Sequence, residues 1–244
     1  LVRNRVGRIL LACEDSLSPL FETMPFSDLI VSKKDIARFI PEADCHIPLL
    51  NLPTVLKTTA ETIPDWVPYI FPEAKRIEEF TDIFADQQGK VKIGLVWRGN
   101  PQHHNDRRRS CSLEHFAKLF EKKDMSFFSL QKEPRDSEKQ ERLVDLSPFL
   151  QTLADTAAII CHLDLVISVD TAVAHLAGAL GKPIWTLIPF APDWRWQPSA
   201  DKSPWYPSMR IFRQQERGNW QEVLNRACIS LGELQRQFRW LREN

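Results

Sequence analysis

An apolar run in the second half of the chain ends in an aspartate and passes directly into a helical stretch of small side chains, Leu165-Val-Ile-Ser-Val-Asp170-Thr171-Ala-Val-Ala-His175. In open α/β sheets, ligands bind outside the carboxyl ends of strands, where the next helix offers free N–H groups and the positive end of its dipole. The small Ala172 side chain allows a diphosphate to approach the backbone, and the Thr171 hydroxyl can donate to a phosphate oxygen. His175 lies one turn into the same helix. The segment predicts an anion site, with a capping role for Asp170 and a packing role for His175 as the structural alternative.

An arginine-rich loop follows another predicted strand, at residues 97–111. Parallel strands end at the same edge of a sheet, so this loop is expected to face the same crevice as Asp170. Guanidinium groups bind phosphate oxygens through paired N–H donors. Candidate phosphate ligands here are Arg98, Asn100, Arg107 and Arg109. The alternative is a solvated, charged loop.

A third loop, Pro189-Phe-Ala-Pro-Asp-Trp194-Arg-Trp196, follows a further predicted strand. Flat rings in such loops can stack on a base or a sugar, which makes Trp194 and Trp196 candidate stacking residues. The alternative is that the tryptophans attach a long loop to the domain. The later run Ser203-Pro-Trp-Tyr-Pro207 is interpreted as structural.

Several motifs of nucleotide and hydrolase chemistry are absent from the sequence. It has no G-x-G-x-x-G, no G-x-x-x-x-G-K-[ST] and no G-x-S-x-G, which argues against nicotinamide binding, P-loop chemistry and a nucleophile elbow. No D-x-D pair is present to hold a metal-bound nucleotide sugar. His103 and His104 are adjacent, and adjacent histidines rarely converge on one ion, so no metal site is expected. What remains is a diphosphate site built from a helix end, arginines and hydroxyls, without a cofactor.

Composition sets broad limits on the class of protein. The 244 residues fit one large domain or two small ones, and 32 basic against 32 acidic side chains give zero net charge. A nucleic-acid-binding surface needs a basic excess, so nucleic acid is not an expected partner. The five cysteines are widely spread without a C-x-x-C pair, which favours a reducing cytoplasm over a disulfide scaffold. No apolar run reaches the roughly 18 residues of a membrane span.

The elements that position these residues alternate between apolar runs and helical patterns, which is typical of a parallel βαβ architecture. Residues 41–72 differ, because frequent prolines allow only short elements there, including a short strand or extended segment at 45–49. Strands are predicted at 7–13, 28–32, 91–97, 125–130, 143–146, 165–169, 184–188 and 209–212, and helices at 15–24, 73–86, from Ser112, 155–163, 171–180 and 219–241. This pattern indicates a six-strand doubly wound unit preceded by a smaller α/β unit.

The motifs V-W-R-G-N-P…N-D-R-R-R-S, D-L-V-I-S-V-D-T-A-V-A-H-L-A-G-A-L-G-K-P, P-D-W-R-W and S-P-W-Y-P occur in this order. Together they resemble the glycosyltransferase-like region of bacterial tetratricopeptide-repeat proteins, which is similar to the ADP-heptose:lipopolysaccharide heptosyltransferases. The resemblance covers roughly residues 5–230 and is strongest over 90–213. It implies a GT-B fold of two Rossmann-like domains, with a partial N-terminal acceptor-side domain and proline-rich linker at 1–86 and a nucleotide-sugar-binding domain at 87–244.

The resemblance also implies roles for individual residues. Asp170, Thr171 and His175 match the family's D-T-G-x-x-H donor motif, and Arg109 falls where the family uses a basic residue against the donor phosphates. Ala172 replaces the motif's glycine, a departure that bears on which sugar is bound. The family's general base is an aspartate in a loop after the first strand, and this chain is expected to begin after that loop.

The implied reaction is a metal-independent inverting transfer from a nucleoside-diphosphate sugar to a glycan, a lipid-linked sugar or a protein. Glu14 and His46 are weak substitutes for the missing base, and each is expected to cap or pack instead. Two alternatives stay open, a non-catalytic binding or scaffold module on the same fold and an epimerase-type enzyme that needs no acceptor. The expected location is the cytoplasm.

Overall fold

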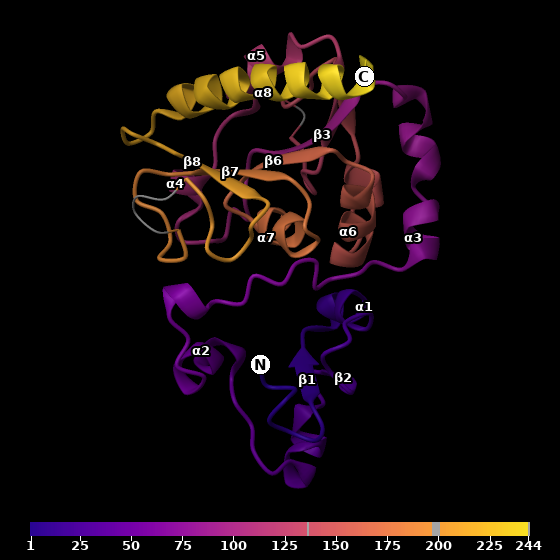
Figure 1. Ribbon diagram of the computed structural model, residues 1–244, viewed down its shortest axis with the longest axis vertical. Coiled ribbons are helices and arrows are strands. Elements are labelled where there is room, and N and C mark those ends of the chain that lie inside the picture. The colour runs from indigo at the N-terminus through magenta and orange to yellow at the C-terminus, as the bar shows by residue number, and fades with distance from the viewer. Residues whose placement is uncertain (136, 197–200, 244) are drawn as a thin grey trace.

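The computed structural model describes residues 1–135, 137–196 and 201–243, which form a small N-terminal unit and a larger α/β domain (Figure 1). The α-helices of these residues are α1 Ser18–Phe21, α2 Leu52–Val55, α3 Ala74–Glu78, α4 Asp106–Arg109, α5 Ala117–Phe120, α6 Leu153–Cys161, α7 Ala172–Ala179 and α8 Trp220–Glu243. The strands are β1 Leu10–Cys13, β2 Leu29–Ser32, β3 Val91–Val96, β4 Met125–Ser129, β5 Leu143–Asp145, β6 Leu165–Val169, β7 Ile184–Ile188 and β8 Met209–Arg213.

The N-terminal unit is built on strands β1 and β2, which pair in parallel with Leu10 opposite Leu29 and Cys13 opposite Ser32. Both strands lie where the sequence predicts them. The predicted helix at 15–24 is shorter, a turn of 3₁₀ helix at Asp15–Leu17 followed by α1. Residues 45–48 form no strand, and the segment continues into a 3₁₀ turn at Leu49–Asn51. Pro48 has no N–H to donate to a strand ladder, so the extended alternative is the correct one.

The segment that joins the two units was predicted as one helix over 73–86 and is instead two short pieces. Helix α3 ends at Glu78, and a 3₁₀ helix covers Thr81–Gln87. Tertiary contacts hold each piece separately against α6. Arg76 forms an ion pair with Asp155, and the Phe84 ring stacks on His162 with centroids 4.9 Å apart. These anchors outweigh the helical pattern of the sequence.

The larger domain is centred on a parallel sheet of six strands in the order β5-β4-β3-β6-β7-β8. Counted from β3, this is the order 3-2-1-4-5-6 of the doubly wound Rossmann architecture. β3 and β6 are the two central strands, with Gly94 opposite Val166 and Val96 opposite Ser168. The order reverses between them, so the loops that follow β3 and β6 diverge and leave a crevice at the carboxyl edge.

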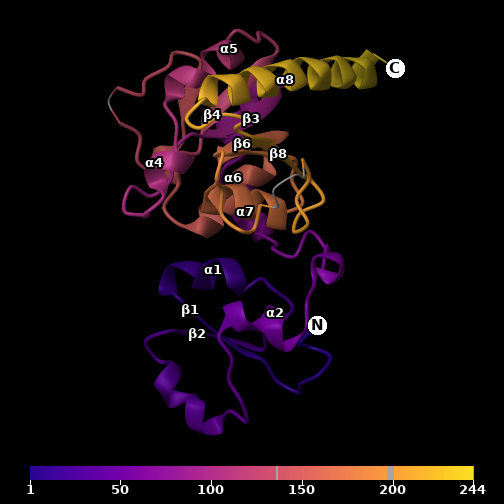
Figure 2. The same cartoon turned by 90° about the vertical axis from the view of Figure 1, so that its left-hand side faces the viewer.

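Helices cover both faces of this sheet (Figures 1 and 2). α6 and α7 pack on one face with Val96, Phe128 and Val166, while α5 and α8 pack on the other with Ile93 and Leu95. Alternate residues of β3 thus enter opposite cores, and the strand reads as a continuous apolar run because both faces are buried.

A short strap, residues 67–70, ties the N-terminal unit to the carboxyl end of α7. The Tyr69 N–H donates to the Ala179 carbonyl at 3.0 Å, and Ile70 joins the core beneath α6 and α7 together with Leu20 of α1. Gly181 ends the helix with φ of +69°, a left-handed conformation that glycine adopts without a steric penalty. The strap therefore fixes the small unit directly below α7.

Candidate functional site

A cavity of about 340 Å³ opens at the carboxyl edge of the sheet, where the strand order reverses. Three loops contribute its walls, those that follow β3, β6 and β7. The lining residues are His103, His104, Asn105, Arg109, Asp170, Thr171, Ala172, His175, Asp193 and Arg195. Their side chains are mostly polar or ionisable, so the cavity is suited to a charged, hydroxyl-rich ligand rather than an apolar one.

Helix α7 directs its first turn into this cavity. Thr171 is its N-terminal boundary residue, and the Thr171 side chain makes no capping hydrogen bond to the helix. Its hydroxyl lies 3.0 Å from the Ser168 hydroxyl, which itself donates to the Val169 carbonyl. The exposed Ala172 adds little bulk at the mouth of the helix. The first-turn N–H groups and the helix dipole are therefore available to an anion, and the Thr171 side chain does not cap this turn.

Arg109 forms the opposite wall and is fixed in place by its own loop. Its guanidinium Nη1 donates to the Asp170 carbonyl at 2.9 Å, and Nε lies 3.5 Å from the Asp106 carboxylate. Gly99 provides the space, because a Cβ there would lie 2.5 Å from Nη2 and 2.7 Å from Cζ of Arg109. Ser110 closes the network by accepting from the Gly99 N–H and donating to Asp106. The arginine thus holds the turn at Asp170 and keeps further N–H donors beside the cavity.

His175 occupies the inner end of the cavity between aromatic rings. It stacks on Trp196 with centroids 5.3 Å apart, and its Nδ1 lies 3.1 Å from the Tyr206 hydroxyl. Nε2 is on the cavity side, 3.8 Å from a carboxylate oxygen of Asp170. Burial lowers the pKa of His175, opposed in part by the charge of Asp170, and this favours the neutral ring.

The loop after β7 gives the cavity a carboxylate and a guanidinium at its outer rim. Arg195 donates to Asp193 at 2.7 Å, and its guanidinium lies 5.1 Å from the centroid of the Trp194 ring. Trp194 is 70% exposed, which leaves its ring accessible to a ligand. Trp196 is only 2% exposed and packs behind His175. The two tryptophans that the sequence treats alike therefore differ in burial, and neither lines the cavity itself: Trp194 is exposed between the lining residues Asp193 and Arg195, whereas Trp196 is buried.

A family model and two solved structures that this chain resembles are those of glycosyltransferases. Residues 130–224 match the model of glycosyltransferase family 9 (heptosyltransferase), which covers β6, α7 and the loops after β7. The fold is that of Escherichia coli ADP-heptose LPS heptosyltransferase II, with a TM-score of 0.62 at 12% identity over 95% of this chain and 93% of that one. The chain resembles the family 9 heptosyltransferases.

Two further relatives agree with this resemblance. A family 9 glycosyltransferase from Veillonella parvula has a TM-score of 0.65 at 14% identity, over 94% of this chain and 90% of that one. Protein FlbA of Caulobacter vibrioides is 26% identical over 92% of this chain. The chain spans 41% of the length of FlbA. The GT-B-like fold expected of the heptosyltransferase resemblance is confirmed by the two structural neighbours.

Not every predicted phosphate ligand of this heptosyltransferase-like domain lies at the cavity. Arg98 points away from it and is held by Glu138 through two hydrogen bonds of 2.8 Å, with its side chain 11% exposed. Arg107 is exposed on α4 and does not line the cavity, and Asn100 accepts from the N–H of Gln102 at the loop tip. The structure does not place Arg98 among the phosphate ligands, contrary to the prediction. Its partner Glu138 is forty residues away in sequence, so composition alone could not reveal this contact.

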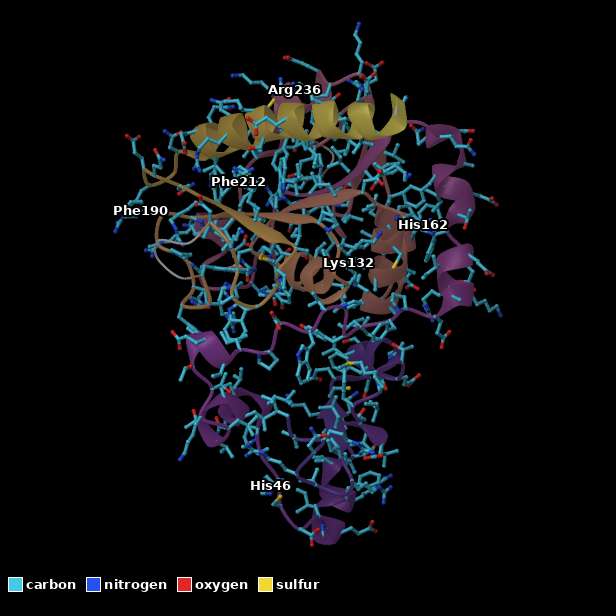
Figure 3. All side chains as sticks on the ribbon, viewed as in Figure 1. His46, Lys132, His162, Phe190, Phe212 and Arg236 are labelled. Carbon is cyan, nitrogen blue, oxygen red and sulfur yellow. The ribbon has the colours of Figure 1, made fainter. Side chains whose placement is uncertain are left out.

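The two weak candidates for a base lie in the N-terminal unit and outside the cavity. Glu14 is exposed and forms an ion pair with Lys33 at 3.0 Å. His46 is exposed and lies in the part of the unit that is far from the six-stranded sheet (Figure 3). Neither makes the capping or packing contact expected of it, because Glu14 precedes its 3₁₀ turn without a side-chain cap hydrogen bond and His46 is exposed.

Sequence reasoning missed several residues that shape the site, among them the wall residues His103, His104 and Asn105. Asp193 and Arg195 flank the predicted Trp194, and their mixed charge in a loop at a strand end could have marked them. Gly99 follows the strand directly, as glycines beside a ligand site often do. Tyr206 lay in the run that was interpreted as structural, and only the fold brings it to His175.

The described residues contain neither a cluster of metal-ligating side chains nor a membrane-spanning helix. Among residues 1–135, 137–196 and 201–243, no three His, Cys, Asp or Glu side chains are grouped as a metal would require. Within the same residues, no helix combines the length and the apolar character needed to cross a membrane.

Proposed function

We propose that this chain binds the diphosphate of a nucleotide sugar in the cavity between α7 and Arg109 and transfers the sugar to an acceptor held by the N-terminal unit. The observation that carries the proposal is the convergence of an uncapped helix end and a fixed guanidinium on one polar cavity at the switch point of the sheet. The resemblance to family 9 heptosyltransferases supports the reaction type. Nucleoside diphosphate sugars are the substrate class that fits this chemistry.

In the proposed reaction, an acceptor hydroxyl attacks the anomeric carbon, the bond from that carbon to the diphosphate oxygen breaks, and the electron pair leaves with the nucleoside diphosphate. The acceptor hydroxyl loses its proton to a general base, and the configuration at the anomeric carbon is inverted. The first-turn amides of α7 and the Arg109 guanidinium stabilise the negative charge that develops on the leaving diphosphate. Trp194 offers a flat ring beside the cavity for the base or the sugar.

A second candidate function is a non-catalytic module that binds the nucleotide sugar or serves as a scaffold. The observation that favours it is the position of Glu14 and His46, both exposed and outside the cavity. The two functions differ in a measurable way, because a module binds nucleotide without releasing a nucleoside diphosphate from its sugar.

The test is a thermal-shift screen of ADP, GDP, UDP and their sugars, followed by calorimetry and by release of the diphosphate with and without EDTA. A ligand present at a hundred times its Kd raises the stability by about 2.7 kcal/mol, enough for a clear shift. If no nucleoside diphosphate stabilises the protein, the proposed function is wrong. Binding without turnover supports the module.

Two matched threonine variants distinguish an effect on nucleotide binding from an effect on the stability of the fold. Thr171→Val removes a hydroxyl at the cavity that caps nothing, so nucleotide affinity should fall while the melting temperature stays nearly unchanged. Thr152→Val removes the capping box of α6, where Thr152 accepts from the Asp155 N–H at 3.1 Å. That variant should lose about 1 kcal/mol of stability and keep its affinity. The opposite pattern would contradict the placement of the ligand at α7.

A further inference from the structure

The only two tyrosines of the chain meet behind the cavity. Tyr206 lies on the segment before β8, and its hydroxyl is 3.1 Å from His175 Nδ1. Tyr69 comes from the strap that leads out of the N-terminal unit, and its hydroxyl lies near enough to that of Tyr206 for each to influence the pKa of the other. A row of three side chains, Tyr69, Tyr206 and His175, therefore runs from the strap to the cavity.

The position of Tyr206 is built into helix α7. Gly178 lies one turn beyond His175, and a Cβ at this glycine would overlap the Tyr206 ring. The missing side chain thus makes a notch in the helix, and the ring fills it with its edge toward His175 at a centroid separation of 5.8 Å. Tyr206 is buried, so its hydroxyl has few positions other than the one beside His175.

The proton positions in this row follow from the charges around it. The Nε2 edge of His175 faces the Asp170 carboxylate at 3.8 Å and the cavity proposed to hold an anion. A bare nitrogen lone pair is repelled by both, whereas an N–H is attracted by both, so Nε2 carries the proton. In a neutral ring Nδ1 is then an acceptor, and the Tyr206 hydroxyl must donate to it.

The charged groups that act on His175 are consistent with a neutral ring. Asp170 on the strand end and Asp193 on the loop after β7 favour the cation, while Arg195 opposes it. Burial is the largest effect and lowers the pKa of His175. Burial also raises the pKa of Tyr206 and of Tyr69, so both hydroxyls stay protonated donors near neutral pH.

We propose that Tyr206 is a positioning residue that holds His175 as the neutral Nε2–H tautomer, with the N–H aimed at the ligand cavity. The inference rests on the proposed function for its consequence, which is a hydrogen bond from Nε2 to a phosphate oxygen. It goes beyond that function because it assigns a role to Tyr206, which does not line the cavity.

The test reads the tautomer directly in the unliganded protein. Histidine labelled with nitrogen-15 gives separate signals for Nδ1 and Nε2, and a His175→Asn variant identifies this ring among the six histidines. In the wild type at pH 7.5, Nε2 should show the shift of a protonated nitrogen and Nδ1 that of an unprotonated one. A protonated Nδ1 in the wild type would overturn the proposal, and this reading needs no variant of Tyr206.

Two tyrosine variants then show which hydroxyl sets the tautomer. Tyr206→Phe should give a mixture of both tautomers, whereas Tyr69→Phe should leave Nε2–H dominant because Tyr206 still donates. An unchanged His175 spectrum in a folded Tyr206→Phe protein would refute the role of Tyr206. For a nucleoside diphosphate that binds the wild type, Tyr206→Phe should reduce the affinity about three- to tenfold, as expected for the loss of one neutral hydrogen bond.

The two proposals fail in different ways. If no nucleotide binds but the wild-type ring is the Nε2–H tautomer, the proposed function is wrong and the positioning role of Tyr206 stands. If nucleotide binds and Nδ1 carries the proton, the positioning role is wrong and the proposed function stands.

Discussion

Replacement of Arg109 by alanine is the most direct perturbation of the site. The guanidinium donates to the Asp170 carbonyl and is backed by Asp106, and its side chain is only 13% exposed. A charge-assisted hydrogen bond to a phosphate contributes about 1.5–3 kcal/mol. Arg109→Ala should therefore weaken the binding of a nucleoside diphosphate by roughly 10- to 150-fold.

The same change has a smaller, separate effect on stability. The Asp170 carbonyl loses its donor, which costs about 1 kcal/mol and lowers the melting temperature by about 2–4 °C for a chain of this size. Calorimetry with the nucleotide identified by screening measures the first effect, and differential scanning calorimetry measures the second. Because both are predicted in advance, a general loss of structure is distinguishable from a loss of binding.

Arg107→Ala is the matched control, since Arg107 lies on the same short helix, is exposed and does not line the cavity. It should change nucleotide affinity by less than about twofold at 0.15 M salt, where exposed charges are screened. If Arg107→Ala weakens binding as much as Arg109→Ala, the loss of affinity comes from the change in net charge and not from a specific contact of Arg109. Unchanged affinity in Arg109→Ala would remove this arginine from the site.

The remaining predictions concern the rim, the loop and the helix notch. Trp194→Ala should weaken the binding of a nucleoside diphosphate in calorimetry but leave the binding of inorganic pyrophosphate unchanged, because only the nucleotide has a base on which the exposed ring can stack. Equal losses of affinity for both ligands would exclude stacking. Burial raises the pKa of Glu138, but hydrogen bonds from Arg98 and from the Arg135 N–H outweigh it and lower the pKa to about 2. This contribution to stability is complete above pH 4.5 and is lost as the pH falls toward 2, so urea titrations at pH 7 and pH 3 should differ more for the wild type than for Glu138→Gln; an equal pH dependence would contradict this. Gly178→Ala should cost about 1–3 kcal/mol by overlap with Tyr206, whereas Gly232→Ala on α8, where the nearest atom is Lys122 Nζ at 3.6 Å, should be neutral or slightly stabilising in the same unfolding assay.

Sequence reasoning succeeded where the pattern of the chain is local. The strands at 165–169 and 184–188 are found with their observed bounds, because a strand buried on both faces is a continuous apolar run that ends at a polar residue. The helix that follows at Thr171 is correct for the same reason. The cavity residues Arg109, Asp170 and His175 were named because each follows a strand end.

It failed where a distant partner decides the position of a side chain. Arg98 and Arg109 look equivalent in the sequence, but Glu138 binds one and Asp170 accepts from the other. Trp196 looks like Trp194 until the fold buries it against His175. The helix predicted at 73–86 is divided by anchors on α6, which no local pattern records. In each case a contact across many residues outweighs the local preference.

The loop after β3 is closed at its base, where the Cys111 N–H donates to the Trp97 carbonyl at 2.9 Å. Its two arginine anchors lie near the same closure, and the end of the tip is tied to α4, where the Asn105 carbonyl accepts from the Arg109 N–H at 3.3 Å. Changing the length of such a closed loop is inexpensive, about 0.6 kcal/mol for a doubling. His103 and His104 lie on this tip and form part of the cavity wall. A change of length within 100–104 therefore alters the wall at His103 and His104 while the closure between Trp97 and Cys111 stays in place, and it is a route by which this scaffold can acquire a new ligand preference.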